Sequence, residues 1–142
     1  MARAVASGPV NAPAEEVWAY VGPFGRLAEF DPGIKKGTLE DGGVQRRLFT
    51  NDGGQIIERL LNYDHKARRY DWKIVELIDA PFPVVNYRAS ISVKDQVPGK
   101  SCVFEMAASF DPASGATEKE VEALLAADFA SVLASVQKKF GG

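Results

Sequence analysis

The sequence predicts an α+β fold in which a curved antiparallel sheet of about seven strands wraps around a long C-terminal helix, with two short helices after the first strand. Three observations support this prediction. Residues 117–140 carry apolar residues at helical spacing, residues 34–110 read as strands separated by short turns, and residues 13–30 carry two short helical patterns. Because short connections join neighbouring strands in antiparallel order, hairpins are expected rather than parallel crossovers.

The first elements predicted are a strand at residues 2–10 and two short helices. Pro13 suits the first position of a helix, which is expected to end near Gly22 because Pro23 follows. A second short helix is expected at residues 24–30, where three apolar side chains would share one face. The following Asp-Pro-Gly sequence then turns the chain.

Six further strands are predicted between residues 34 and 110, with turns rich in Gly, Asp, Asn and Pro between them. Their ranges are 34–40, 44–50, 55–63, 69–79, 84–97 and 101–110.

Strand alternation predicts which side chains face the C-terminal helix. Around the turn at residues 64–67, the alternation that contains Tyr63, Arg59, Arg69, Asp71 and Lys73 is the more polar one and is expected to face solvent. The opposite alternation is expected to face inward and contains Ile56, Glu58, Leu60, Asn62, Tyr70, Trp72, Ile74, Glu76 and Ile78. In the next hairpin the inward set is Tyr87, Ala89, Ile91, Val93, Cys102, Phe104, Met106, Ala108 and Phe110.

The C-terminal helix has the strongest pattern in the chain. Thr117 and Glu120 form a capping box at its start, Lys138 and Lys139 lie near its negative end, and Gly141 follows as a stop. Its apolar stripe contains Val121, Leu124, Leu125, Phe129, Val132, Leu133, Val136 and Phe140. A helix with such a stripe must pack on another layer, and the preceding strands supply it.

Length and composition limit the classes of function. The 142 residues fit a single domain, residues 1–142, and 46% hydrophobic with 25% charged residues is typical of globular proteins. A net charge of −2 gives no attraction to nucleic acid, and no apolar run is long enough for a membrane span. The single Cys102 excludes an internal disulfide and favours a reducing compartment, so a cytoplasmic location is expected.

Several segments carry a resemblance to a known family: APAEEVWAYVGPFGRLAEFDP, DGGQIIERLL, RRYDWKIVE, NYRASISV, SFDP and the closing helix. Together they resemble the START-like helix-grip superfamily (SRPBCC), with the polyketide cyclase/dehydrase and lipid-transport-like branch most similar. The resemblance covers nearly the whole chain. It implies that the sheet grips the long helix and leaves a cavity for a small hydrophobic molecule. Relatives include lipid carriers, hormone receptors and aromatase/cyclases.

Two departures from the family pattern weaken the case for a defined catalyst. Relatives often have a Trp-His-Pro-like turn where this chain has Phe30-Asp31-Pro32, so a histidine suited to proton transfer is missing. Met106 stands where an aromatic residue is often found, and methionine gives a more adaptable lining.

The resemblance and the strand alternation together predict the residues that line the cavity. Ala89 and Ala108 are expected at its centre, where small side chains would leave volume unfilled. The predicted lining is Phe30, Asp31, Glu58, Leu60, Tyr70, Trp72, Ile74, Glu76, Tyr87, Ala89, Ile91, Phe104, Met106, Ala108, Leu125, Phe129 and Val132. Pro81, Phe82 and Pro83 are predicted to form a gate loop beside the open end of the cavity.

Glu58 and Glu76 are open to two interpretations. As neighbours in an apolar cavity they could not both ionise easily, so at least one pKa should rise and provide an acid, a base or a polar anchor. Alternatively each carboxylate is structural and pairs with Arg46 or Arg47 on the preceding strand. His65 and Cys102 are not expected to be catalytic, and no metal site or cofactor is expected, because no second His or Cys lies at ligand spacing.

Three functions remain open on these observations. The favoured hypothesis is binding or transport of a small hydrophobic or aromatic molecule, with no nucleic acid partner and a monomeric or homodimeric state. The second is a cyclase/aromatase- or dehydratase-like enzyme in which Glu58, Glu76 or Tyr87 moves protons, although no catalytic residue is assigned. The third is an interaction module with a closed core.

Overall fold

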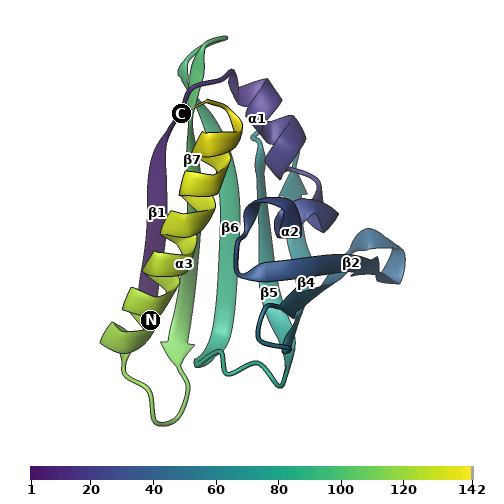
Figure 1. Ribbon diagram of the computed structural model, residues 1–142, viewed down its shortest axis with the longest axis vertical. Helices are drawn as coiled ribbons and strands as arrows, with labels where there is room; N and C mark the ends of the chain where they lie inside the picture. Colours follow the sequence, from purple (N-terminus) through teal and green to yellow (C-terminus); the bar gives the residue numbers. More distant parts are fainter. Residues whose placement is uncertain (142) are drawn as a thin grey trace.

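The computed structural model describes residues 1–141, and its elements follow one another in the predicted order (Figure 1). The strands are β1 (Ala2–Val10), β2 (Ile34–Glu40), β3 (Gln45–Thr50), β4 (Gln55–Asp64), β5 (Arg69–Ile78), β6 (Val84–Val97) and β7 (Ser101–Pro112). The helices are α1 (Ala14–Val21), the short 3-10 turn η1 (Phe24–Arg26), α2 (Leu27–Phe30) and α3 (Glu118–Lys139), with a further 3-10 turn η2 (Asp41–Gly43) between β2 and β3.

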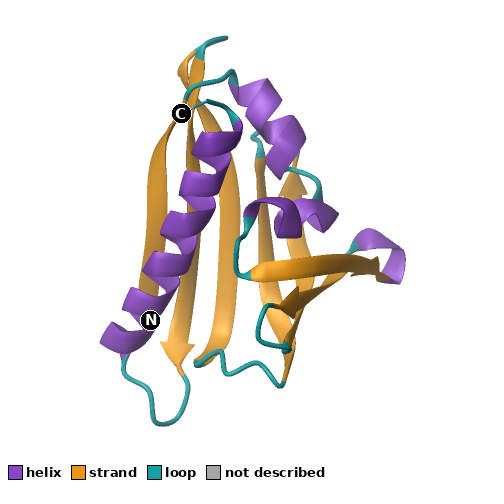
Figure 2. Cartoon of the chain, in the orientation of Figure 1, coloured by secondary structure: helices purple, strands orange, loops and turns teal. Residues whose placement is uncertain are grey.

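All seven strands form one antiparallel sheet in the order β1-β7-β6-β5-β4-β3-β2. Helix α3 lies along β1 and β7 on one face of the sheet, whereas α1 and α2 cover the same face beside it (Figure 2). The predicted α+β helix-grip fold is therefore confirmed. Because α3 packs mainly on β1 and β7, it lies farther from the β2–β5 half of the sheet.

The start of α3 forms the predicted capping box. The Glu120 backbone N–H donates to the Thr117 hydroxyl oxygen at 3.2 Å, and that hydroxyl donates to Glu120 Oε1 at 2.8 Å. Most of the predicted stripe is buried, but Leu124 is 48% exposed. It lies at the border of the stripe and not at its centre.

Two bulges in the β4–β5 hairpin change several of the predicted orientations. The register shifts between the pairs Ile57–Glu76 and Glu58–Ile74, which leaves Val75 without a partner. As a result Glu76 is exposed, and the prediction that it faces inward is wrong. Leu77 packs against the core in its place.

A second bulge at Leu61 reverses the other end of the same hairpin. Tyr63, which was expected to face solvent, pairs with Tyr70 and stacks on its ring at a centroid distance of 5.7 Å. Its hydroxyl donates to the Gly22 carbonyl oxygen at 2.9 Å. Asn62, predicted to face inward, is exposed because of the same bulge.

The inward face of the β6–β7 hairpin agrees with the alternation. All of its predicted inward residues are buried. Ala89 and Ala108 lie opposite each other in the register and belong to the packed core, together with apolar side chains from α3. The expected hollow is not centred on these two alanines, because both are buried in the core cluster and neither lines the pocket beneath α3.

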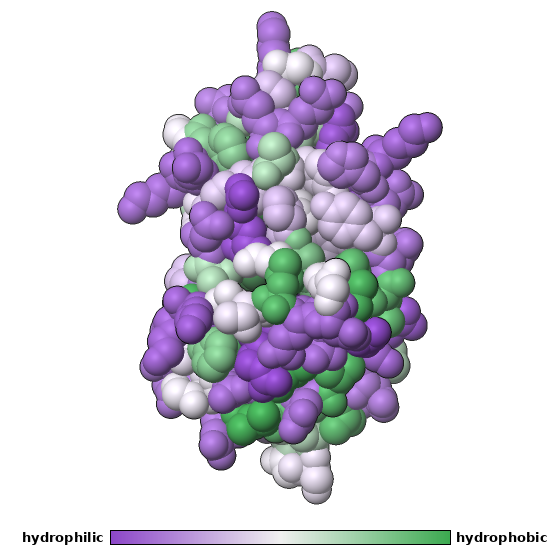
Figure 3. Space-filling model, turned by 90° about the vertical axis from the view of Figure 1, so that its right-hand side faces the viewer, coloured by the Kyte–Doolittle hydropathy of each residue, from purple (hydrophilic) through white to green (hydrophobic). Residues whose placement is uncertain are grey.

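The hydropathy of the surface differs between the two halves of the side formed by β2–β4. Figure 3 shows hydrophilic side chains over most of the upper half of this side, whereas hydrophobic ones gather in the lower half. Among the described residues, no helix is both long enough and apolar enough to cross a membrane.

Candidate functional site

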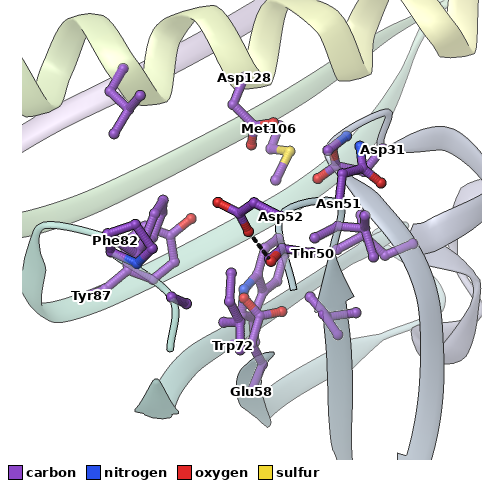
Figure 4. A pocket seen from close by; sticks show the side chains of 18 residues that line it. Asp31, Thr50, Asn51, Asp52, Glu58, Trp72, Phe82, Tyr87, Met106 and Asp128 are labelled. Atoms are coloured by element: carbon purple, nitrogen blue, oxygen red, sulfur yellow. Dashed lines mark hydrogen bonds between the residues drawn. The ribbon is translucent and has the colours of Figure 1, made fainter. Parts of the chain in front are cut away.

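A pocket of about 440 Å³ opens between the first half of α3, the turn after α2, the β3–β4 turn and the β5–β6 connection (Figure 4). Its walls are mostly apolar, and its polar groups come from separate elements. The lining residues are Leu27, Asp31, Gly33, Ile34, Leu48, Thr50, Asn51, Asp52, Ile56, Glu58, Trp72, Ala80, Pro81, Phe82, Tyr87, Met106, Leu124 and Asp128.

The pocket contains part of the predicted lining. Asp31, Glu58, Trp72, Tyr87 and Met106 line it, and so do Pro81 and Phe82 of the predicted gate loop. The third residue of that loop, Pro83, is half-buried and does not line the pocket.

The other predicted lining residues do not reach this pocket. Glu76 is exposed, and Leu60 and Ile74 are half-buried at the border of the core. The remaining ones are buried in the packed core: Phe30, Tyr70, Ala89, Ile91, Phe104, Ala108, Leu125, Phe129 and Val132. The sequence placed the cavity along the whole interface between sheet and helix, whereas the structure leaves only one end of that interface open.

Sequence reasoning chose the wrong residues of α3 and missed the β3–β4 turn. Leu124 and Asp128 are four residues apart, so they lie on the same side of α3, next to the apolar stripe. An acidic residue directly beside Phe129 in that stripe was the available signal. Thr50, Asn51 and Asp52 gave no signal of this kind, because polar residues are normal in a hairpin turn.

Two facing aspartates form the most unusual part of the site. Asp31 is 5% exposed, and its Oδ1 accepts a hydrogen bond from the Gly33 backbone N–H at 3.0 Å. Burial and the negative charge of Asp128 raise the pKa of Asp31 to about 7. Burial also raises the pKa of Asp128. Burial and the neighbouring negative charge therefore oppose ionisation of both carboxyl groups at once.

Glu58 is held by a buried arginine. Arg46 Nε donates to Glu58 Oε1 at 2.8 Å, and Arg46 Nη1 donates to the Phe24 carbonyl oxygen at 3.0 Å and the Tyr70 hydroxyl oxygen at 3.2 Å. The guanidinium also lies 4.2 Å from the centre of the Phe24 ring. Glu58 therefore pairs with Arg46, one of the two partners considered, and it also lines the pocket.

The expected rise in pKa occurs at Glu58 through burial, without the expected repulsion from Glu76. Burial raises the pKa of the Glu58 carboxyl group, and the charge and hydrogen bond of Arg46 act against this increase. Glu76 does not contribute, because it lies on the other face of the bulged strand. Arg47, the other predicted partner, pairs with Glu40 at 2.7 Å instead.

The Tyr87 hydroxyl points into the pocket (Figure 4). Tyr87 is 5% exposed, and its hydroxyl makes no hydrogen bond with any side chain or backbone group of residues 1–141. Burial, followed by the charges of Glu58 and Asp128, keeps its pKa well above the usual value, so the hydroxyl stays protonated. The Phe82 ring packs edge-on against Tyr87 at a centroid distance of 5.6 Å.

Asn86 sets the orientation of Tyr87 at a bulge in β6. The register shifts between Val85 and Arg88, and Asn86 adopts a positive φ of 54° that brings its side chain to Asp111 Oδ2 at 2.9 Å. The residue that follows therefore faces the pocket.

The lone histidine and the lone cysteine do not line the pocket. The Trp18 indole N–H donates to His65 Nδ1 at 2.9 Å, away from the pocket, and Cys102 is a buried core residue. Within residues 1–141, no group of three or more His, Cys, Asp or Glu side chains is arranged to hold a metal ion.

A sheet that grips a C-terminal helix and leaves a pocket between them defines the helix-grip class of proteins. The chain matches the family model "Polyketide cyclase / dehydrase and lipid transport" over residues 1–141, and it belongs to that family. No protein of curated function matches it.

Solved structures show the same relationship. Protein XoxI from Bacillus cereus is 31% identical, with a TM-score of 0.93 over 99% of this chain and 96% of that chain. An uncharacterized protein from Bacillus thuringiensis is 32% identical, with a TM-score of 0.91 over 98% of each chain. A START superfamily protein from Mycobacterium smegmatis is 14% identical, with a TM-score of 0.80 over 99% of this chain and 97% of that chain, and shares the fold alone.

Proposed function

We propose that this protein binds a small, largely apolar molecule in the pocket beneath the first half of α3 and acts as a carrier, a sensor or a storage protein. The observation that carries the proposal is the 440 Å³ pocket lined by apolar side chains from separate elements. Pockets of about 300–1,000 Å³ with apolar walls and a few polar groups are typical of small-molecule sites.

The difference between the buried core and the open pocket also supports this proposal. The apolar side chains between α3 and β1 and β7 are buried in one core cluster, away from the pocket. At the open end, Leu48 and Ile56 are buried yet border empty volume. This arrangement disfavours the third hypothesis, an interaction module with a closed core.

A neutral fluorescent probe, N-phenyl-1-naphthylamine, tests the proposal directly. We expect its fluorescence to rise on saturable binding to the parent protein. Leu124→Trp should reduce this binding, because Leu124 borders the pocket and is 48% exposed, so the larger ring can enter the pocket without disturbing the core. Val97→Trp is the matched control, since Val97 is 49% exposed and does not line the pocket.

Native mass spectrometry of freshly purified protein complements the titration. A single small adduct on the parent that is absent from Leu124→Trp would reveal the natural ligand. Equal probe binding by the parent and Leu124→Trp, or no probe binding at all, would refute the proposal.

One observation favours a second candidate function, proton-transfer catalysis of the cyclase or dehydratase kind. Asp31 has a pKa of about 7 inside an apolar pocket, which is suited to exchanging a proton near neutral pH. The test is to incubate the co-purifying molecule with the parent and with Asp31→Asn. A change of ligand mass with the parent alone would favour an enzyme, and an unchanged mass with both would favour a carrier.

A further inference from the structure

We infer that the pocket selects a ligand that carries a protonated amine, with the ammonium group between Asp31 and Asp128 and an apolar, preferably aromatic, body against Trp72 and Phe82. This inference rests on the proposed function and names the chemical class of the ligand.

The charges around the pocket are the first observation. Asp31, Asp52, Glu58 and Asp128 line it, whereas none of the lining residues is a lysine, an arginine or a histidine. Arg46 compensates the charge of Glu58, but Asp31, Asp52 and Asp128 make no ion pair within residues 1–141. An apolar cavity with uncompensated carboxylates attracts a cation and disfavours a carboxylate or phosphate ligand.

The unpartnered hydroxyl of Tyr87 is the second, independent observation. The side chain is only 5% exposed, and its oxygen is directed into the pocket from the side opposite Asp31 (Figure 4). Because no group of residues 1–141 occupies this hydroxyl and it opens into the pocket, it is free to bind a polar group of a ligand. An ammonium group can donate to this oxygen as well as to the two aspartates.

Tyr87, Asp31 and Asp128 line the same pocket. After burial, the charges of Glu58, Asp128 and Asp31 all raise the pKa of the Tyr87 hydroxyl, which requires these carboxylates to lie near it. Asp128 reaches the same volume from α3 and Asp31 from the turn after α2 (Figure 4). Charge-assisted hydrogen bonds from an ammonium group to carboxylates are among the stronger polar contacts in proteins.

The aromatic walls suit the same ligand class. Trp72, Phe82 and Tyr87 all line the pocket, and aromatic faces attract cations and pack against apolar rings. Trp72 is 1% exposed, so its ring is held by the core and forms a rigid wall.

Protonation of Asp31 links the binding of an amine to pH. Without ligand, burial and then the charge of Asp128 on α3 raise the pKa of Asp31 and favour its protonated form, while the Gly33 N–H and Arg46 on β3 act in the opposite direction. Glu58 on β4 also faces this group, because the charge of Asp31 raises the pKa of Glu58. A bound ammonium group supplies the missing positive charge and displaces the proton of Asp31. The affinity for an amine should therefore rise as the pH increases through about 7.

Three matched probes test the inference: 2-(1-naphthyl)ethylamine, 2-(1-naphthyl)ethanol and 1-naphthylacetate, which differ in charge and share one aromatic body. At pH 8 we expect the amine to bind the parent about tenfold or more tightly than the alcohol, with the acetate weakest. Asp31→Asn and Asp128→Asn should each remove this preference and leave the affinity for the alcohol unchanged. Glu16→Gln, which removes one charge from the exposed side of α1, is the control and should change neither affinity.

The pH dependence gives a second readout. From pH 6 to pH 8 the affinity of the parent for the amine should rise, while that of Asp31→Asn should stay constant, because an aliphatic amine is protonated throughout this range. Equal affinity of the parent for amine and alcohol, or an unchanged preference for the amine in both variants, would overturn the inference. In that case, binding of N-phenyl-1-naphthylamine would show that the proposed function still holds. Failure of that neutral probe and of all three naphthyl probes would refute both.

Discussion

Asp31 combines an unfavourable location with a good hydrogen bond. It is 5% exposed and faces another acidic side chain, which raises its pKa from 3.8 to about 7. A carboxyl group whose folded-state pKa is raised destabilises the folded protein as pH rises from the unfolded-state pKa towards the folded-state one. The cost is absent below pH 3.8 and complete above about pH 7.

Replacing Asp31 with asparagine should remove this cost. The neutral side-chain amide still offers an oxygen to the Gly33 N–H, so we expect Asp31→Asn to match the parent near pH 3.5 and to be more stable at pH 8. The gain should be a few kcal/mol, about 4 kcal/mol at most for a change of roughly three pKa units. Urea unfolding at both pH values measures it, with Glu16→Gln as the charge control. A variant that is equally stable or less stable at pH 8 would contradict this account of the pair.

Arg46 differs from Asp31, because its buried positive charge is paired with the Glu58 carboxylate. Arg46→Met should cost about 3–5 kcal/mol at pH 7, since it leaves the Glu58 carboxylate buried without its partner. Losing Arg46 raises the pKa of Glu58 further, so this loss of stability should be larger at pH 7 than at pH 4.

Two further variants separate the effect of the Arg46–Glu58 ion pair from other effects of replacing Arg46. Arg46→Met combined with Glu58→Leu should recover much of the lost stability, because both buried charges are removed together. Glu76→Gln should change stability by less than about 0.5 kcal/mol, because Glu76 is exposed. A loss for Arg46→Met that is the same at pH 4 and pH 7 would show that packing, not charge, accounts for it.

At the level of elements, the β3–β4 turn and the β5–β6 connection lie in close contact at the edge of the pocket. A Cβ atom on Gly54, in the β3–β4 turn, would lie 2.6 Å from the Asp79 carbonyl oxygen and 2.9 Å from Ala80 Cα. Both of those atoms belong to backbone that cannot turn aside as a flexible side chain can. Gly54 is thus required by this close approach.

Gly54→Ala should therefore push the two connections apart. We expect a loss of about 1–3 kcal/mol in the free energy of unfolding and weaker binding of N-phenyl-1-naphthylamine. Gly37→Ala in β2 is the matched control, because its Cβ would meet Leu48 Cδ2 at an ordinary 3.4 Å. Similar stability and probe binding for both variants would show that the rim tolerates displacement.

The β5–β6 connection is the candidate gate. Phe82 lines the pocket and packs edge-on against Tyr87, and two short-range backbone hydrogen bonds, Phe82 N–H to Ala80 O and Val84 N–H to Phe82 O, order the loop locally. We expect Phe82 to close over a bound ligand, so amide hydrogen exchange at residues 80–84 should slow when the probe is bound. The β6–β7 turn at residues 98–100 serves as an internal reference and should not change. Equal exchange rates at residues 80–84 with and without probe would argue against a gate.

The elements themselves were well predicted from the sequence, because turn residues and periodicity mark them locally. Glycine, aspartate and proline mark the turns between the strands, and the apolar spacing of α3 is continuous. The bulges at Leu61 and Val75 could not be read in the same way, since one extra residue in a strand changes the pairing without changing the composition. Each bulge reverses the orientation of the residues after it, and this is why Glu76 and Asn62 were assigned to the inward face although both are exposed.

At the level of the whole molecule, the sequence predicted that a cavity exists but not where it lies. Alternation shows which side chains face inward, whereas the position of a void depends on where a helix lies across the sheet. Helix α3 packs on β1 and β7, so Ala89 and Ala108 are covered and the opening lies towards β2–β5. Asp128 joins Asp31 in this opening although the two lie near opposite ends of the chain, and no local pattern indicates such a pairing.

Mapping a bound ligand by NMR tests the central claim most directly. Uniformly labelled protein is titrated with N-phenyl-1-naphthylamine while backbone amide shifts are followed. We expect saturable changes at residues 31–34, 50–56, 80–87 and 124–128, which surround the pocket, and none in β1 or in the second half of α3, residues 132–139. The absence of saturable changes, or changes centred on the packed interface of α3 with β1 and β7, would contradict the account.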